Sequence, residues 1–97
     1  MSARVGLGAV GPVLEASETG HVVAAAILAS NPGAKLEDHG AYLRVSVPER
    51  CTVARRDIEQ RLGRSFELPR DLELVMPAFQ GFLRLSDDTA EWRIEAP

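Results

Sequence analysis

Polar and hydrophobic residues alternate along several short stretches of this chain, which is the spacing of strands that bury one face. The clearest stretch is residues 41–47, in which every odd-numbered position is apolar and Pro48 follows. The other stretches that predict strands are residues 10–14, 35–38, 72–76, 79–85 and 91–95.

Two residues qualify these strands. Pro12 has no N–H to donate to a neighbour, so we expect residues 10–14 to form an edge strand. Gly81 interrupts the alternation of residues 79–85 and predicts a β-bulge or a close backbone approach.

A first helix is predicted from about residue 18 to residue 29. Ser17 or Thr19 would cap its start, and Asn31-Pro32-Gly33 would turn the chain at its end. A helix that is apolar all round is normally covered on every side, and this one has no charge between His21 and Ser30. Two interpretations stay open. Either the alanines are present because alanine has the highest helix propensity, or the face formed by Ala24, Ala25 and Ala29 contacts another protein.

A second helix is predicted over residues 54–62. Ile58 and Leu62 are four residues apart and share one face, and Gly63 suits the C-terminal end. Ala54 provides no hydroxyl to cap the start. The elements then follow in the order βαββ-αββ, which predicts an α+β fold: one compact domain with mostly antiparallel sheets and two helices. The domain would cover residues 10–97, and the glycine-rich residues 1–9 would form a flexible arm.

Composition narrows the function. The chain has 97 residues, enough for one core but with little room for a deep substrate cavity. Its net charge of −3 argues against nucleic acid as a partner, because phosphate neutralisation needs a clustered basic surface. The arginines between Arg50 and Arg64 are interleaved with Glu49, Asp57 and Glu59, which fits a solvated helix face. Cys51 is the only cysteine, which favours a reducing cytoplasm. The longest apolar run, residues 22–29, is too short to span a membrane, and we see no signal peptide.

Three apparent catalytic motifs fail on their context. Residues 6–11 match the dinucleotide fingerprint G-x-G-x-x-G, but no strand precedes them and no helix opens within them. Glu18 and His21 have the spacing of diiron ligands, yet a diiron site needs two such pairs on a four-helix bundle. Cys51, His39 and Asp38 lie on separate elements, with no signature sequence around the thiol. We therefore expect no enzymatic activity, no metal and no other cofactor.

The order of several local motifs resembles that of the effector proteins of toluene and alkene monooxygenases, which are relatives of the regulators of phenol and methane hydroxylases. The resemblance covers residues 10–94, nearly the whole chain. The motifs that carry it are Val10-Gly11-Pro12, Asn31-Pro32-Gly33, Ala41-Tyr42-Leu43-Arg44-Val45, Ile58-Glu59-Gln60-Arg61-Leu62-Gly63-Arg64 and Ala78-Phe79-Gln80-Gly81.

The resemblance implies a non-catalytic coupling protein without metal, flavin or haem. Such a protein would bind the large subunit of a diiron hydroxylase and tune active-site access, coupling and turnover. It would share or contest docking surface with a Rieske-type ferredoxin. The residues predicted to lie at the partner interface are Ala24, Ala25, Ala29, Asn31, Pro32, Gly33, Phe79, Gln80 and Gly81.

Two other functions fit the same sequence. A free-standing small-molecule-binding module would use the glycine-rich arm as a lid and would purify with its ligand. A structural subunit would hold a permanent partner, whereas an effector associates reversibly.

Overall fold

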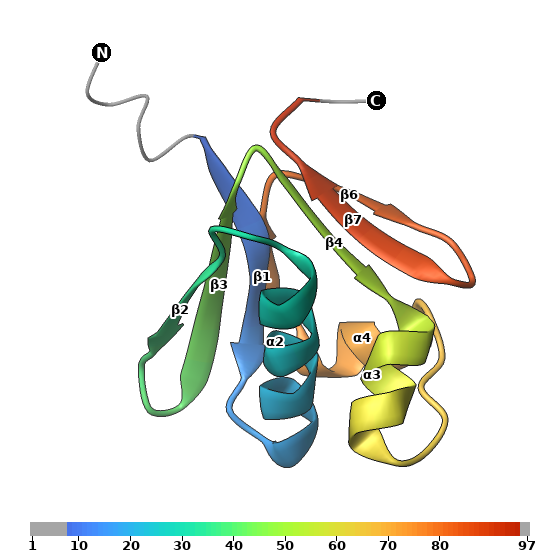
Figure 1. The fold of residues 1–97 in the computed structure, drawn as a ribbon. Helices are drawn as coiled ribbons and strands as arrows, with labels where there is room; N and C mark the ends of the chain where they lie inside the picture. The colour runs from blue at the N-terminus through green and yellow to red at the C-terminus, as the bar shows by residue number, and fades with distance from the viewer. Residues whose placement is uncertain (1–7, 96–97) are drawn as a thin grey trace.

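The structure, a computed structural model, describes residues 8–95 (Figure 1). Within these residues the chain forms seven strands and three helices. In chain order they are β1 (Ala9–Glu15), α2 (Glu18–Ser30), β2 (Lys35–Asp38), β3 (Tyr42–Pro48), β4 (Arg50–Ala54), α3 (Arg55–Leu62), α4 (Arg70–Val75), β5 (Ala78–Gln80), β6 (Phe82–Leu85) and β7 (Thr89–Arg93).

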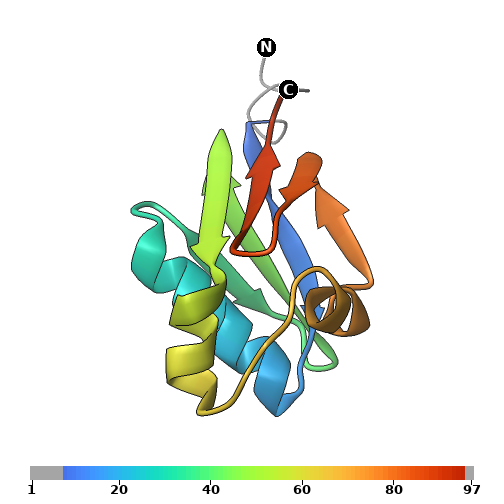
Figure 2. The same cartoon turned by 90° about the vertical axis from the view of Figure 1, so that its right-hand side faces the viewer.

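The strands form two antiparallel sheets, one in the order β2-β3-β1-β5 and the other in the order β4-β7-β6. Helix α2 packs against strands of the first sheet and also contacts β4 and α3 (Figures 1 and 2). Both described ends of the chain lie at one end of the molecule, and α3 and α4 lie at the other. The predicted α+β class with antiparallel sheets is confirmed.

Strand β1 is central, so the prediction of an edge strand is wrong. It pairs with β3 at both of its ends and with β5 in the middle, where Gly11 and Pro12 face Gln80 and Phe79. The β3 register skips Gly11 and Pro12, so the missing N–H of Pro12 falls within a gap in that pairing. Gly11 has a φ of 143°, and a Cβ there would collide with the carbonyl oxygen of Val45. The Gly11-Pro12 pair therefore lets β1 run between two neighbours.

Two further element predictions are corrected. Residues 70–75 form a helix, where a strand was predicted over residues 72–76. Its buried residues, Leu72 and Val75, are three apart, while Leu74 is 69% exposed, and that spacing belongs to a helix. Strand β4 was not predicted, because its five residues follow Pro48 closely and lead directly into α3.

The strand predicted over residues 79–85 is divided at Gly81. Its first part, β5, belongs to the first sheet, and its second part, β6, belongs to the second sheet. The final strand ends at Arg93, two residues before the predicted end. Of the arm predicted for residues 1–9, residues 1–7 lie outside the described residues, whereas Ala9 opens β1.

The helix ends follow the predicted capping residues. Ser17 Oγ accepts a hydrogen bond from the backbone N–H of Gly20 at 3.1 Å, and Gly63 closes α3 with a φ of 81°. Ala54 makes no side-chain cap, as its identity predicts. The backbone N–H of Arg55 instead donates to the carbonyl oxygen of Asp88 at 2.7 Å, so the β6–β7 hairpin supplies the missing partner.

Asn31 joins helix α2 to the second sheet. Its Nδ2 donates to the carbonyl oxygens of Ile27 and Thr52 at 2.8 and 2.7 Å, and its Oδ1 accepts from the N–H of Thr52 at 3.0 Å. Strand β4 is an edge strand, and this side-chain amide satisfies the outward-facing backbone groups of Thr52. Asn31 is only 7% exposed. It therefore has a structural role here, unlike the interface role predicted for it.

We expect Asn31→Ala to lower the free energy of unfolding by about 2–3 kcal/mol, because it leaves the Thr52 backbone groups and the Ile27 carbonyl without their partner. Urea denaturation measures this change. The neighbouring Ser30→Ala, at an exposed position, is the control and should change the free energy of unfolding by less than about 0.5 kcal/mol. Equal effects of the two substitutions would contradict the assignment.

Candidate partner-binding surface

Two exposed phenylalanines flank the bend at which the chain passes from one sheet to the other. Phe79 in β5 is 45% exposed and Phe82 in β6 is 50% exposed. We call Phe79, Gly81 and Phe82 the aromatic corner. Exposed aromatic side chains at a rigid backbone position are typical of the residues that contribute most to protein–protein binding.

Gly81 allows this corner to form. Its φ is 102°, and a Cβ on it would lie 2.8 Å from both the carbonyl oxygen of Arg93 and Cγ1 of Val10. The bend is thus packed between β1 and β7. Since there is no space for a side chain at residue 81, the role of the glycine is to let the chain bend. The residues available to contact a partner are the flanking phenylalanines.

Gln80 is held by a side chain of the first sheet. Its Oε1 accepts a hydrogen bond from Nη2 of Arg44 at 3.0 Å, and both residues are exposed. The bond spans the width of β1, because Arg44 belongs to β3 and Gln80 to β5. Gln80 therefore remains accessible beside the aromatic corner, with its amide oriented by the arginine.

A charged row crosses the second sheet next to Phe82. Phe82 is opposite Arg93 in the register of β6 and β7, and Arg93 is opposite Arg50 in β4. Glu91, whose side chain is 12% exposed, receives a hydrogen bond from Arg50 Nε and lies 3.2 Å from Arg93 Nε. The hydrogen bond from Arg50 is the main cause that lowers the pKa of Glu91. The row thus places two guanidinium groups beside an exposed aromatic ring.

The structure places the predicted helix residues in different surroundings. Ala24 is 1% exposed and belongs to the core, so it cannot contact a partner and the prediction for it is wrong. Ala25 and Ala29 are exposed, together with Leu28, which is 36% exposed. The outward arc of α2 is therefore narrower than the sequence suggested, because the first sheet and β4 cover the side that carries Ala24.

Pro32 and Gly33 are exposed in the turn that follows α2, and Gly33 has a φ of 85°. This turn lies beside β4, since Asn31 is bonded to Thr52. The aromatic corner begins β6, at the opposite edge of the sheet ordered β4-β7-β6. The predicted interface residues thus fall on two separate surfaces. Phe82 is absent from the predicted interface residues, although its position one residue after a strand glycine is a usable signal.

The apparent catalytic motifs receive no support from the geometry. Residues 9–11 of the fingerprint already belong to strand β1, and the next helix starts only at Glu18. Burial raises the pKa of the Cys51 thiol to about 12, which keeps it protonated at neutral pH and unfit as a nucleophile. Among residues 8–95 no group of three or more His, Cys, Asp or Glu side chains is placed to hold a metal ion.

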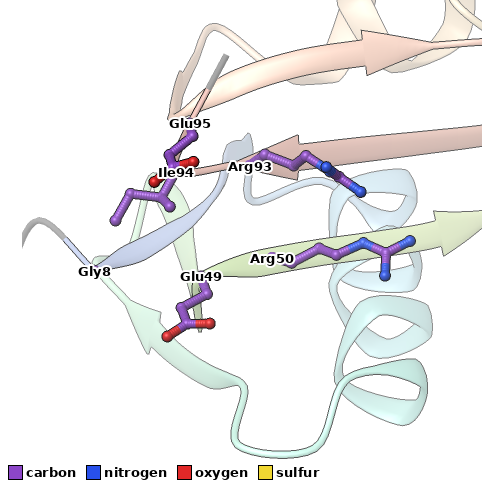
Figure 3. A pocket seen from close by; sticks show the side chains of 6 residues that line it. All are labelled: Gly8, Glu49, Arg50, Arg93, Ile94 and Glu95. Atoms are coloured by element: carbon purple, nitrogen blue, oxygen red, sulfur yellow. The ribbon is translucent and has the colours of Figure 1, made fainter. Parts of the chain in front are cut away.

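A hollow of about 520 Å³ lies where the start of β1 meets the ends of the second sheet. Figure 3 shows that its charged side chains diverge, with Glu49 on one side and Arg50 and Arg93 directed to the other. A small-molecule site needs a few convergent polar groups around an apolar cavity, and this hollow lacks that arrangement. Within the described part of the chain, no helix is long and apolar enough to cross a membrane.

The described residues thus define a small α+β protein with an exposed aromatic corner and with no catalytic arrangement among them. Residues 8–93 match the MmoB/DmpM family. The alkene monooxygenase effector subunit of Xanthobacter autotrophicus is 38% identical over 85 residues, which cover 86% of this chain and 83% of that protein.

Two solved structures have a similar fold. A chain of a phenol hydroxylase–regulatory protein complex superimposes with a TM-score of 0.80 at 21% identity, over 88% of this chain and 97% of that one. The soluble methane monooxygenase regulatory protein B gives a TM-score of 0.70 at 21% identity, over 91% of this chain and 66% of that one.

The chain therefore belongs to the MmoB/DmpM family, as the sequence resemblance predicted. It is an effector, or regulatory, component of a multicomponent monooxygenase and not a catalytic one. The alternative of a small-molecule-binding module has no support.

We expect Gly81→Ala to destabilise the protein more than Gly40→Ala. Gly40 has a φ of 85° and no atom within 4 Å of an added Cβ, so its substitution costs only the left-handed backbone, about 1–2 kcal/mol. Gly81→Ala adds the contacts with Arg93 and Val10, which we expect to cost about 1–3 kcal/mol more. Thermal and urea unfolding measure both. Equal losses would show that the bend has room for a side chain.

The lowered pKa of Glu91 predicts an acid-dependent contribution to stability. A carboxylate with a lower pKa in the folded state stabilises the fold above its ordinary value of 4.5, and this contribution is lost as pH falls through the folded-state value. Glu91→Gln should thus be less stable than the parent protein at pH 7, and the difference should shrink in acid. Urea denaturation at pH 7 and at a pH below 4.5 measures this difference in the free energy of unfolding. Glu73→Gln, at an exposed position, is the control. A difference that stays constant with pH would contradict the ion-pair assignment.

Proposed function

We propose that this effector protein binds the diiron hydroxylase of a multicomponent aromatic or alkene monooxygenase through its aromatic corner, and that it tunes active-site access, coupling and turnover. The observation that carries this proposal is the pair of half-exposed phenylalanines at a bend that cannot adjust, because Gly81 is packed against β1 and β7. A preorganised apolar anchor loses little conformational freedom on binding.

The relatives support the choice of partner. One of the similar solved structures is a complex of phenol hydroxylase with its regulatory protein, and the 38% identical relative is the effector subunit of an alkene monooxygenase system. The hydrocarbon would be chosen by the hydroxylase, since the effector contributes no substrate cavity of its own.

Binding would regulate turnover by selecting a conformation of the hydroxylase. A ligand shifts an equilibrium only as far as its affinities for the two states differ. The aromatic corner would then bind the oxygen-ready state more tightly than the resting state. The guanidinium groups of Arg50 and Arg93 would meet carboxylates or carbonyl groups around the apolar contact.

Two further features belong to this proposal. A Rieske-type ferredoxin would share or contest the surface of the hydroxylase on which the effector docks. The complex would operate in the cytoplasm, in keeping with a single, buried cysteine.

We expect Phe82→Ala to weaken stimulation of product formation by roughly ten-fold or more at limiting effector, which corresponds to about 1.4 kcal/mol of binding energy. The ring is half exposed, so the free energy of unfolding should change by less than about 1 kcal/mol. Titration of the effector against its hydroxylase, followed by product formation, measures the effect.

Leu36→Ala is the matched control. Leu36 is 40% exposed in β2, at the far edge of the first sheet, and its removal should leave stimulation unchanged. If Phe82→Ala stimulates like the parent protein while Leu36→Ala does not, the docking surface lies elsewhere.

The outward arc of α2 is a second candidate, favoured by the exposure of Ala25 and Ala29 beside Leu28. Ala25→Glu and Ala29→Glu should fold normally, whereas Ala24→Glu should unfold the protein because it places a charge in the core. Circular dichroism and the same stimulation assay separate the cases. If Ala25→Glu or Ala29→Glu loses stimulation while Phe82→Ala stimulates like the parent protein, the docking surface is the outward arc of α2.

A further inference from the structure

Helix α3 and the turn after it carry arginines that the described residues do not neutralise. Arg56, Arg61 and Arg64 are exposed, and none of their guanidinium nitrogens has a carboxylate oxygen within 4.0 Å among residues 8–95. We call these three residues, with Gln60, the basic face. In a chain with a net charge of −3, this is a local concentration of the opposite sign.

Glu59, which lies in the same helix as Arg56 and Arg61, makes its contacts with other residues. Glu59 Oε2 accepts a hydrogen bond from the backbone N–H of Phe66 at 2.9 Å and lies 3.7 Å from Nε of Arg55. Its role is to hold the loop after α3 and to neutralise Arg55. The sequence suggested that acidic residues interleaved with the arginines would balance the whole cluster. The structure limits this balance to Arg55.

Two hollows of mixed polar and apolar lining adjoin the basic face. Arg56 and Arg64 line a shallow depression with Gln60, Glu59 and Ser65. Arg64 also lines a hollow of about 210 Å³ with Phe66, Asp71 and Leu74. Leu74 is 69% exposed, the largest fraction among the exposed large hydrophobic residues of the described chain. The surface thus combines guanidinium groups with one protruding aliphatic side chain, and both kinds of group favour contact with protein.

The basic face lies away from the aromatic corner. Gly81 contacts Val10 and Arg93, which lie toward the end of the molecule where the described chain begins and finishes. Helices α3 and α4 lie at the other end in both views (Figures 1 and 2). The molecule extends 44 Å along its longest axis. A partner seated on the aromatic corner therefore leaves the basic face open.

We propose that the basic face binds the acidic surface of a second protein, with carboxylates on Arg56 and Arg64 and an apolar side chain in the hollow beside Leu74. Protein is favoured over nucleic acid because Leu74 adds an apolar contact that phosphates cannot use. Because the carboxylate of Asp71 also lines this hollow, an apolar side chain suits the hollow better than an acidic one. This inference does not depend on which surface binds the hydroxylase.

The test uses the full chain, labelled for NMR, and a short peptide of glutamate and leucine as the acidic probe. We expect amide shifts confined to α3 and to residues 63–75, which disappear near 1 M salt, where the Debye length is about 3 Å. The double substitution Arg56→Glu and Arg64→Glu should weaken binding about ten-fold or more, roughly 1.4 kcal/mol. Leu74→Ala should weaken it to a smaller degree.

Two controls decide the interpretation. Arg84→Glu changes the same charge at another exposed arginine without an ion pair among residues 8–95, and it should leave binding unchanged. A peptide with glutamine in place of glutamate should not bind. Equal binding of that peptide, equal loss in Arg84→Glu, or stronger shifts with oligothymidylate would overturn the proposal. If the double variant is unfolded by circular dichroism, Arg56→Gln and Arg64→Gln replace it, with the same expected direction.

Discussion

The packing of the Gly81 bend between β1 and β7 determines how the two sheets meet. At this point the chain stops pairing with β1 and begins to pair with β7. Strands β5 and β6 are separated by Gly81 alone, with no loop between them. A change of direction within so few residues needs a backbone that other residues rarely adopt and a side chain that occupies no space. The exposed phenylalanines and the central place of β1 both depend on this crossing.

The other end of the second sheet is closed by a side chain. Asn31 completes β4 where no further strand follows, and it does so from the residue that ends α2. One sheet edge is therefore tied to the helix and the other to the crossing at Gly81. A small domain buries a limited share of its surface, so its apolar core alone does little to determine how the elements are arranged. Directional hydrogen bonds such as those of Asn31 therefore contribute much to that arrangement.

Local signals in the sequence predicted most elements of the fold. Ser17 and Gly63 mark helix ends through their own chemistry, and residues 41–47 alternate because one face of β3 is buried. The errors arose where the partner is distant in the sequence. Pro12 indicated an edge, because nothing local shows that β5 pairs with β1 just where β3 does not. Leu72, Leu74 and Met76 alternate as they would in a strand, and only tertiary burial shows that Leu72 and Val75 form the inward face of a helix.

The same local signals predict only part of the candidate partner-binding surface. Phe79 and Gln80 were found because they flank a strand glycine, yet the residue on its other side, Phe82, was overlooked. Ala24 and Ala25 are indistinguishable in a run of alanines, and only the position of the first sheet separates a core residue from a surface one. Which face of a helix is buried depends on tertiary contacts, which composition alone does not contain.

The way helix α3 begins limits how the sequence of the β6–β7 hairpin can vary among relatives of this protein. Its first N–H is satisfied by the backbone carbonyl of Asp88, not by a side chain at residue 54. A backbone carbonyl is present whatever residue occupies the position, so the bond to the helix does not require aspartate at residue 88. Ser86 does hold the hairpin tip through its hydroxyl, which accepts from the N–H groups of Asp88 and Thr89. An insertion or deletion there would move the carbonyl away from the helix. Natural relatives that keep alanine or another non-capping residue at position 54 should therefore vary at position 88 while conserving the length of this hairpin.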